Sequence, residues 1–146
     1  MGWSNVVEWT HVVATGALVG SQLLFTLLVW MRFPEQGDGS AYQVWRRVEA
    51  LYRRFALVVF ILGVVSGALL LRYTLISPEL YQSTPYGRLL EVKVGSVLAF
   101  GFLGTMMPRA HAGRDGASSP RARRLSALNL VAALTASVAG YMLRYV

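Results

Sequence analysis

The chain has 146 residues, of which 55% are hydrophobic and only 14% are charged, against roughly 25% charged residues in soluble domains. This composition excludes an ordinary soluble protein and indicates segments that lie in a lipid bilayer. Cysteine is absent, which excludes disulfides, thiolate metal sites and cysteine nucleophiles.

The first apolar segment, Trp9 to Met31, carries no charge and predicts a membrane-spanning helix over about residues 6–32. Polar residues in and just before this segment fall within about 60° on a helical wheel: Glu8, His11, Thr15, Gln22 and Thr26. Because unpaired polar groups are costly at membrane depth, we expect this polar stripe to face the interior of the protein. Interhelical hydrogen bonds suffice to explain Thr and Gln, whereas His11 is a candidate functional residue.

Three further apolar segments predict spans over about residues 53–75, 88–108 and 124–144. The stretch from Tyr42 to Arg54 is amphipathic and is expected to lead into the second span. The connections between the spans are short, which favours an up-down-up-down arrangement. The predicted fold is therefore all-α: a polytopic membrane protein with one four-transmembrane-helix bundle formed by residues 1–146.

The basic residues are concentrated in the first and third loops, and the tail before the first span has no Lys or Arg. Ten arginines flank these loops: Arg32, Arg46, Arg47, Arg53, Arg54, Arg109, Arg114, Arg121, Arg123 and Arg124. By the positive-inside rule, we expect both loops in the cytoplasm and both termini outside, in the inner (plasma) membrane of the cell. Since this placement and an anionic inner leaflet explain the net charge, the expected partner is the lipid bilayer and not nucleic acid.

Two pairs of glycines stand four residues apart within the spans, Gly16 with Gly20 and Gly63 with Gly67. Such pairs let helix backbones approach closely. They are expected at helix–helix contacts, either within one bundle or between chains in a homo-oligomer or a larger membrane complex. The fourth span carries a comparable face of small residues: Ser126, Ala133, Ser137 and Gly140.

Ionisable groups near the outer ends of the spans are candidates for a site. Glu8 precedes His11 by three residues, which is close enough on a helix for its carboxylate to orient the imidazole. Lys93 either extends outward to the headgroups or turns inward, toward a bound anion or toward His11. Met142 in the fourth span is a further candidate metal ligand. His111 lies across most of the hydrocarbon, about 30 Å away, so the two histidines are not expected to share a metal.

The segment Thr84-Pro-Tyr-Gly-Arg-Leu-Leu-Glu-Val-Lys93 resembles the loop and helix start of copper-resistance D (CopD) family membrane proteins, where a Thr-x-Tyr-Gly-x-x-Leu-x-x-Lys pattern opens a helix. The first span, with His11 followed by two glycines, also resembles that family. It is similar as well to the related HemJ group of protoporphyrinogen oxidases, which have four spans, an early His on the first and a Lys on the third. The resemblance covers roughly Trp9 to Gly104 and implies that His11 binds haem b with Lys93 nearby.

On this resemblance, the expected function is that of an integral membrane haem b-binding redox protein, in electron transfer or in the oxidation of a porphyrinogen or quinol. His11 would be the axial ligand of the haem iron, oriented by Glu8, and Lys93 would lie close to the ring. Arg88 or Arg144 would meet the propionates. Two alternatives stay open: a copper transport or resistance protein, and a non-catalytic transmembrane subunit of a larger complex. The sequence leaves open whether the protein is an enzyme.

Overall fold

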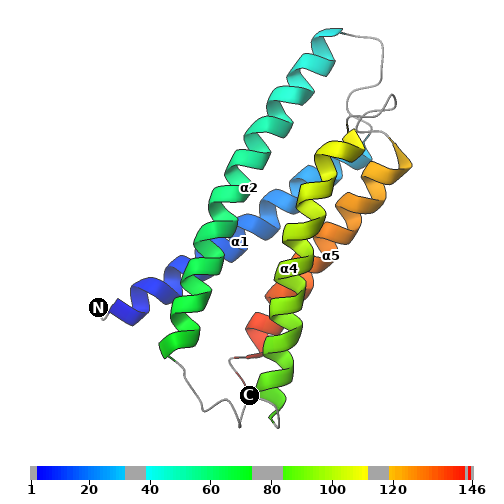
Figure 1. Ribbon diagram of the computed structural model, residues 1–146. Coiled ribbons are helices and arrows are strands. Elements are labelled where there is room, and N and C mark those ends of the chain that lie inside the picture. Colours follow the sequence, from blue (N-terminus) through cyan, green and yellow to red (C-terminus); the bar gives the residue numbers. More distant parts are fainter. Residues whose placement is uncertain (1–2, 32–38, 74–83, 112–118, 144, 146) are drawn as a thin grey trace.

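The computed structural model describes five segments of the chain: residues 3–31, 39–73, 84–111, 119–143 and 145. These contain four long helices: α1 (Trp3–Trp30), α2 (Gly39–Tyr73), α4 (Pro85–His111) and α5 (Pro120–Met142). The helices run alternately up and down, so that the first turn of α1 and the last turn of α5 lie at the same end of the bundle (Figure 1). The predicted all-α four-helix bundle is confirmed.

The surface of the bundle is largely apolar, and its interior holds several polar side chains among apolar ones. Each helix contains a segment long and apolar enough to cross a membrane: Trp3–Trp30, Gln43–Arg72, Pro85–Met106 and Pro120–Met142. Leu57 and Leu98 on the outside are 59% and 67% exposed, whereas the amide side chains of Gln22 and Asn129 are buried. A water-soluble bundle has the opposite arrangement. The chain is therefore a multi-pass membrane protein whose helices contact the lipid bilayer.

The helix boundaries follow local sequence signals. α2 begins at Gly39 and includes the amphipathic stretch from Tyr42 to Arg54 without a break, because residues 40–62 contain no Gly or Pro. α5 begins after Ser119, whose hydroxyl accepts a hydrogen bond from the Ala122 backbone N–H at 3.1 Å. Proline then occupies the first helical position, where no backbone N–H is needed.

Three of the four interfaces between neighbouring helices are packed closely. α1 packs against α2 and α5, and α4 packs against α5. Between the described residues of α2 and α4, no pair of Cα atoms comes within 8 Å. Instead, the rings of Phe60 and Phe100 stack between these helices, with centroids 5.8 Å apart. We call this interface, which side chains bridge, the α2–α4 seam.

A buried hydrogen-bond network joins α1, α2 and α5 near the start of α5. The Gln22 carbonyl accepts from the Tyr52 hydroxyl and, at 3.1 Å, from the Asn129 amide. The Gln22 amide donates to the Thr26 hydroxyl at 3.2 Å and to the Ser126 carbonyl at 3.4 Å. The expectation that Gln22 and Thr26 make interhelical hydrogen bonds is confirmed, since Thr26 also donates to the Ser126 carbonyl, at 3.3 Å.

The two glycine pairs behave differently. A Cβ atom at Gly67 would lie 3.0 Å from Cε1 of His11, and Gly63 also faces α1. Gly16 and Gly20 would meet no atom within 4 Å, so the expectation of close packing inside the bundle is wrong for this pair. The reason is the rotation of α1: its buried polar groups face inward, and both glycines lie on the opposite side of the helix.

Candidate functional site

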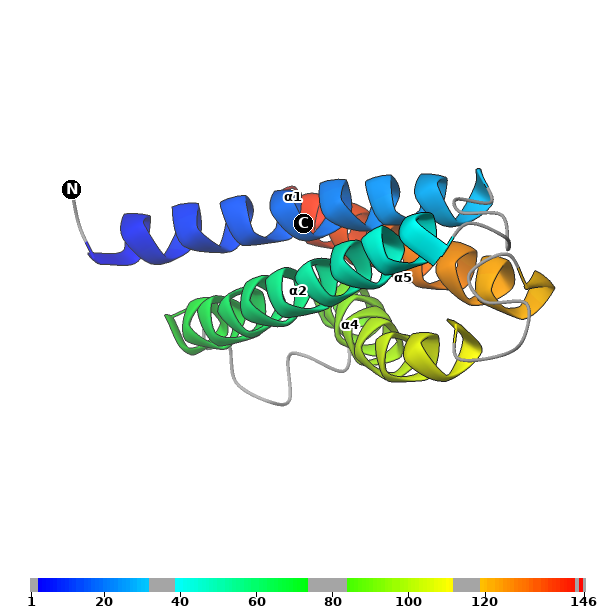
Figure 2. The same cartoon turned by 90° about the horizontal axis from the view of Figure 1, so that it is seen from above.

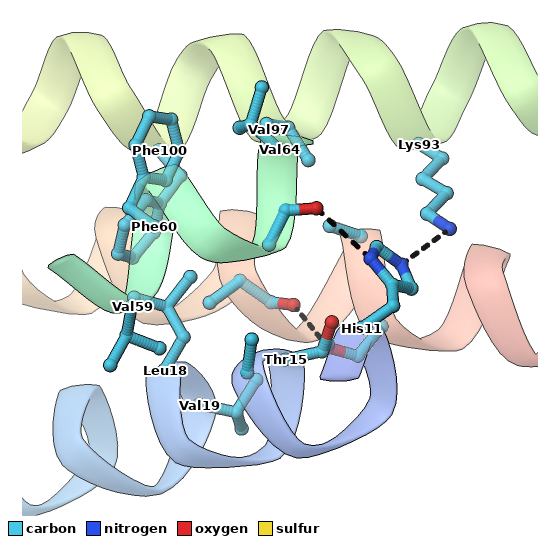
Figure 3. A pocket seen from close by; sticks show the side chains of 15 residues that line it. His11, Thr15, Leu18, Val19, Val59, Phe60, Val64, Lys93, Val97 and Phe100 are labelled. Carbon is cyan, nitrogen blue, oxygen red and sulfur yellow. Dashed lines mark hydrogen bonds between the residues drawn. The ribbon is translucent and has the colours of Figure 1, made fainter. Parts of the chain in front are cut away.

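His11 on α1 and Lys93 on α4 meet inside the bundle (Figure 3). Nζ of Lys93 lies 3.3 Å from Nε2 of His11, and both side chains are half-buried. Lys93 therefore turns inward. Gly140 on α5 provides the space for this, because a Cβ atom there would lie 3.2 Å from Nζ and 3.3 Å from Cε of Lys93.

The other nitrogen of the imidazole is held by α2. Nδ1 of His11 lies 3.0 Å from the Gly63 carbonyl oxygen and 3.1 Å from the Ser66 hydroxyl oxygen. Ser66 directs its own hydrogen to the Leu62 carbonyl, at 2.6 Å. Since a carbonyl only accepts, the hydrogen between the imidazole and Gly63 belongs to Nδ1, an assignment based on the network. Nε2 of the neutral ring then accepts a hydrogen bond from Lys93.

The sequence Gly63-Val-Val-Ser-Gly67 forms a cradle for the His11 ring. Its first residue offers a carbonyl lone pair, Ser66 offers a hydroxyl, and Gly67 has no side chain where the ring lies. A helical carbonyl has two lone pairs, so Gly63 can accept from the imidazole as well as from its own helix. The glycine pair predicted to pack two helices thus also positions the candidate site residue His11.

A small cavity of about 70 Å³ extends from the His11–Lys93 pair along the bundle. All four helices contribute to its walls, and Thr15 and Ser137 are its further polar residues. The apolar lining includes Leu18, Val19, Phe60, Val97, Phe100 and Ala133. A single water needs roughly 10–15 Å³ of such space, so the cavity has room for a few water molecules beside the two ionisable groups.

The other predicted site residues do not gather at this pair. Glu8 is exposed, because the first turns of α1 project beyond the other helices (Figure 2). The expectation that Glu8 faces the bundle interior is therefore wrong. Arg88 is exposed, Met142 is 48% exposed, and Arg144 lies outside the described residues. The groups that contact the two imidazole nitrogens come from α2 and α4.

The two histidines lie at opposite ends of the bundle. His111 is the last residue of α4, and the helix rises about 27 Å between Lys93 and this position. His11, which contacts Lys93, therefore cannot share a metal ion with His111 of the same chain. Within the described segments, no three His, Asp or Glu side chains gather as a metal site.

Several contributors to the site and its support escaped the sequence reasoning. The Gly63 carbonyl is a backbone group and leaves no signal in the sequence. Ser66 and Asn129 are polar residues within apolar spans, which is the signal that could have identified them. Tyr52 lies in a segment predicted only as an amphipathic lead-in, so its half-buried hydrogen bond to Gln22 could not be foreseen.

The site is suited to binding. Nε2 of His11 has a lone pair that can bind a metal, and the Lys93 ammonium can donate to an anion or to an acceptor oxygen. Both stand beside apolar space, on helices that are long and apolar enough to cross a membrane. No protein-family model, no curated protein and no solved structure matches this chain.

Proposed function

We propose that this membrane protein binds haem b between its helices, with His11 as an axial ligand. Its role is electron transfer or the oxidation of a porphyrinogen or quinol. The observation that carries the proposal is the position of His11 Nδ1, 3.0 Å from the Gly63 carbonyl oxygen. This contact assigns the hydrogen to Nδ1, so that Nε2, which Lys93 contacts, carries the lone pair that can bind a metal. Histidines that bind metals almost always donate their other N–H in this way.

The residues fit the ligand chemistry of haem iron, which proteins commonly hold through His. The cavity has to enlarge before it can hold a haem, because it measures about 70 Å³, whereas sites for drug-sized ligands measure roughly 300–1,000 Å³. The α2–α4 seam is the interface that can widen, because side chains alone bridge it. A bound haem supplies one-electron redox chemistry.

Lys93 has to leave Nε2 before His11 can ligate iron, and its flexible four-carbon stem permits this. Its ammonium then remains beside the bound group as a hydrogen-bond donor. Arg88 or Arg144 stays the proposed partner of the propionates. Met142 stays the proposed further ligand, and Glu8 contributes a negative charge near the outer end of α1.

An absorption spectrum of the purified protein in detergent, after incubation with haem, tests this proposal. We expect a Soret band that His11→Ala abolishes and that the control His111→Ala retains. Lys93→Met should keep the fold and change the spectrum. Loss of the band in the His111 variant alone would place the ligand elsewhere. Bound copper without a Soret band would support copper handling instead. A protein that binds neither haem nor copper would fit a non-catalytic subunit that assembles through Gly16 and Gly20.

We further propose that the protein lies in the inner membrane with both termini outside, because the basic loops follow the positive-inside rule. The chain has no cysteine, so single cysteines report their side of the membrane without interference. Cysteines introduced at Ser4 and Ser118 should react with an impermeant thiol reagent from opposite sides. Reaction from the same side would contradict this topology.

A further inference from the structure

The cavity beside His11 and Lys93 extends to the α2–α4 seam, whose residues line part of it. Val64 of α2 lines the cavity and is also 44% exposed on the outer surface. Val97 of α4 lies across from it, next to Lys93 in the direction of Phe100 (Figure 3). The outer surface here is apolar, as shown by Ile61 of α2, which is 51% exposed. The outer side of the seam is therefore suited to contact with hydrocarbon.

Two phenyl rings close the rest of the seam. Phe60 and Phe100 stack with an interplanar angle of 27°, and Phe100 is only 7% exposed. The Phe60 ring lies against Gly101, where a Cβ atom would be 3.2 Å from Cζ. Since the two backbones stay apart at this point, movement of the rings is enough to connect the cavity with the bilayer.

Close contacts block two other routes to the cavity. Between α1 and α2, the His11 ring lies directly against Gly67. Toward the start of α5, the buried side chains of Gln22 and Asn129 join three helices, and Phe25 stacks on Tyr52 with ring centroids 4.1 Å apart. A molecule that enters through the α2–α4 seam has to displace only side chains that move by rotation.

We propose that the α2–α4 seam is a lateral entrance through which a lipid-soluble ligand passes from the bilayer core to the His11–Lys93 pair. The residues that line the cavity define the class of ligand. The ligand has an apolar body, which fills the space lined by Leu18, Phe60 and Phe100. It also has an acceptor oxygen, which receives a hydrogen bond from Lys93. This proposal rests on the proposed function in one respect: both place the ligand in the cavity beside His11 and Lys93. Its test does not require haem.

Cysteine reactivity in liposomes tests the entrance, because the native chain offers no competing thiol. Ser137→Cys places a thiol on the cavity wall, and Val138→Cys places one on the neighbouring residue, which is 57% exposed to lipid. The probes are an apolar N-alkylmaleimide that dissolves in the bilayer and a cationic thiosulfonate that stays in water. The entrance predicts reaction of the cavity thiol with the maleimide and protection from the cation.

The seam variant Phe100→Ala should then speed up the maleimide reaction at Ser137→Cys by roughly two- to tenfold, the range that corresponds to the loss of one aromatic pair. The reaction at Val138→Cys should not change, which controls for folding and for reagent partitioning. Equal acceleration at both thiols would indicate general loosening and contradict the proposal. So would no acceleration at Ser137→Cys, or faster reaction there with the cationic reagent. If the protein shows no Soret band but Phe100→Ala accelerates the maleimide reaction only at Ser137→Cys, the haem proposal is rejected and the proposal of a lateral entrance stands.

Discussion

Substitution of Gly67 by Ala tests the cradle around His11 most directly. The added Cβ atom would lie 3.0 Å from Cε1 of His11, whereas carbon atoms prefer separations of about 3.5–4.0 Å. The imidazole cannot withdraw freely, because Nδ1 is bonded to Gly63 at 3.0 Å and Nε2 to Lys93 at 3.3 Å. Either the two helices separate or these hydrogen bonds lengthen.

The magnitude follows from two opposing contributions. Overpacking of a close contact costs about 1–3 kcal/mol, and Ala gains about 1 kcal/mol over Gly in a helix. Gly67→Ala should therefore reduce the free energy of unfolding by up to about 2 kcal/mol. Gly16→Ala is the matched control on α1, since its Cβ atom would meet nothing within 4 Å. This control should gain stability or stay unchanged.

Thermal unfolding of both variants in the same detergent measures the difference. A separation of about 1–3 kcal/mol corresponds to several degrees in Tm, at roughly 2–4 °C per kcal/mol for a chain of this size. Gly67→Ala should also weaken haem retention, because it displaces the proposed ligand, while Gly16→Ala should not. Equal Tm values for the two variants would show that the His11 ring does not lie against α2 as described here.

Three further substitutions test other parts of the structure. Gln22→Leu should lower the Tm, because it leaves the buried Asn129 amide without its acceptor at a cost of roughly 1–3 kcal/mol; adding Asn129→Leu should recover part of this loss, and a fully additive loss would argue against the network. Gly140→Ala should displace the flexible end of Lys93 and so alter the spectrum of the haem-loaded protein, with little change in Tm. An unaltered spectrum would show that Lys93 does not lie beside the haem. Gly20→Leu should leave monomer stability intact and reduce any oligomer seen by light scattering, and a lower Tm would instead place Gly20 inside the bundle.

The sequence by itself determined the number, type and approximate position of the helices. Uncharged apolar segments of about 20 residues can only be helices in a bilayer, since the hydrocarbon offers no partner for unpaired backbone groups. The inward orientation of Gln22 and Thr26 followed for the same reason. The start of α2 at Gly39 was not determined by the sequence, because the amphipathic first part of this helix is suited to a helix both inside and outside the membrane.

Only the tertiary structure decided which residues meet. Helical periodicity gives the side of α1 on which His11 lies, but the contacts with Gly63 and Lys93 depend on which helices are neighbours and on their rotation. The GxxxG spacing identified glycines that permit close approach without specifying a partner, so Gly67 lies against His11 while Gly16 lies on the exposed side. The α2–α4 seam, which only side chains bridge, also results from how four helices are arranged around a shared cavity, and no single segment encodes it.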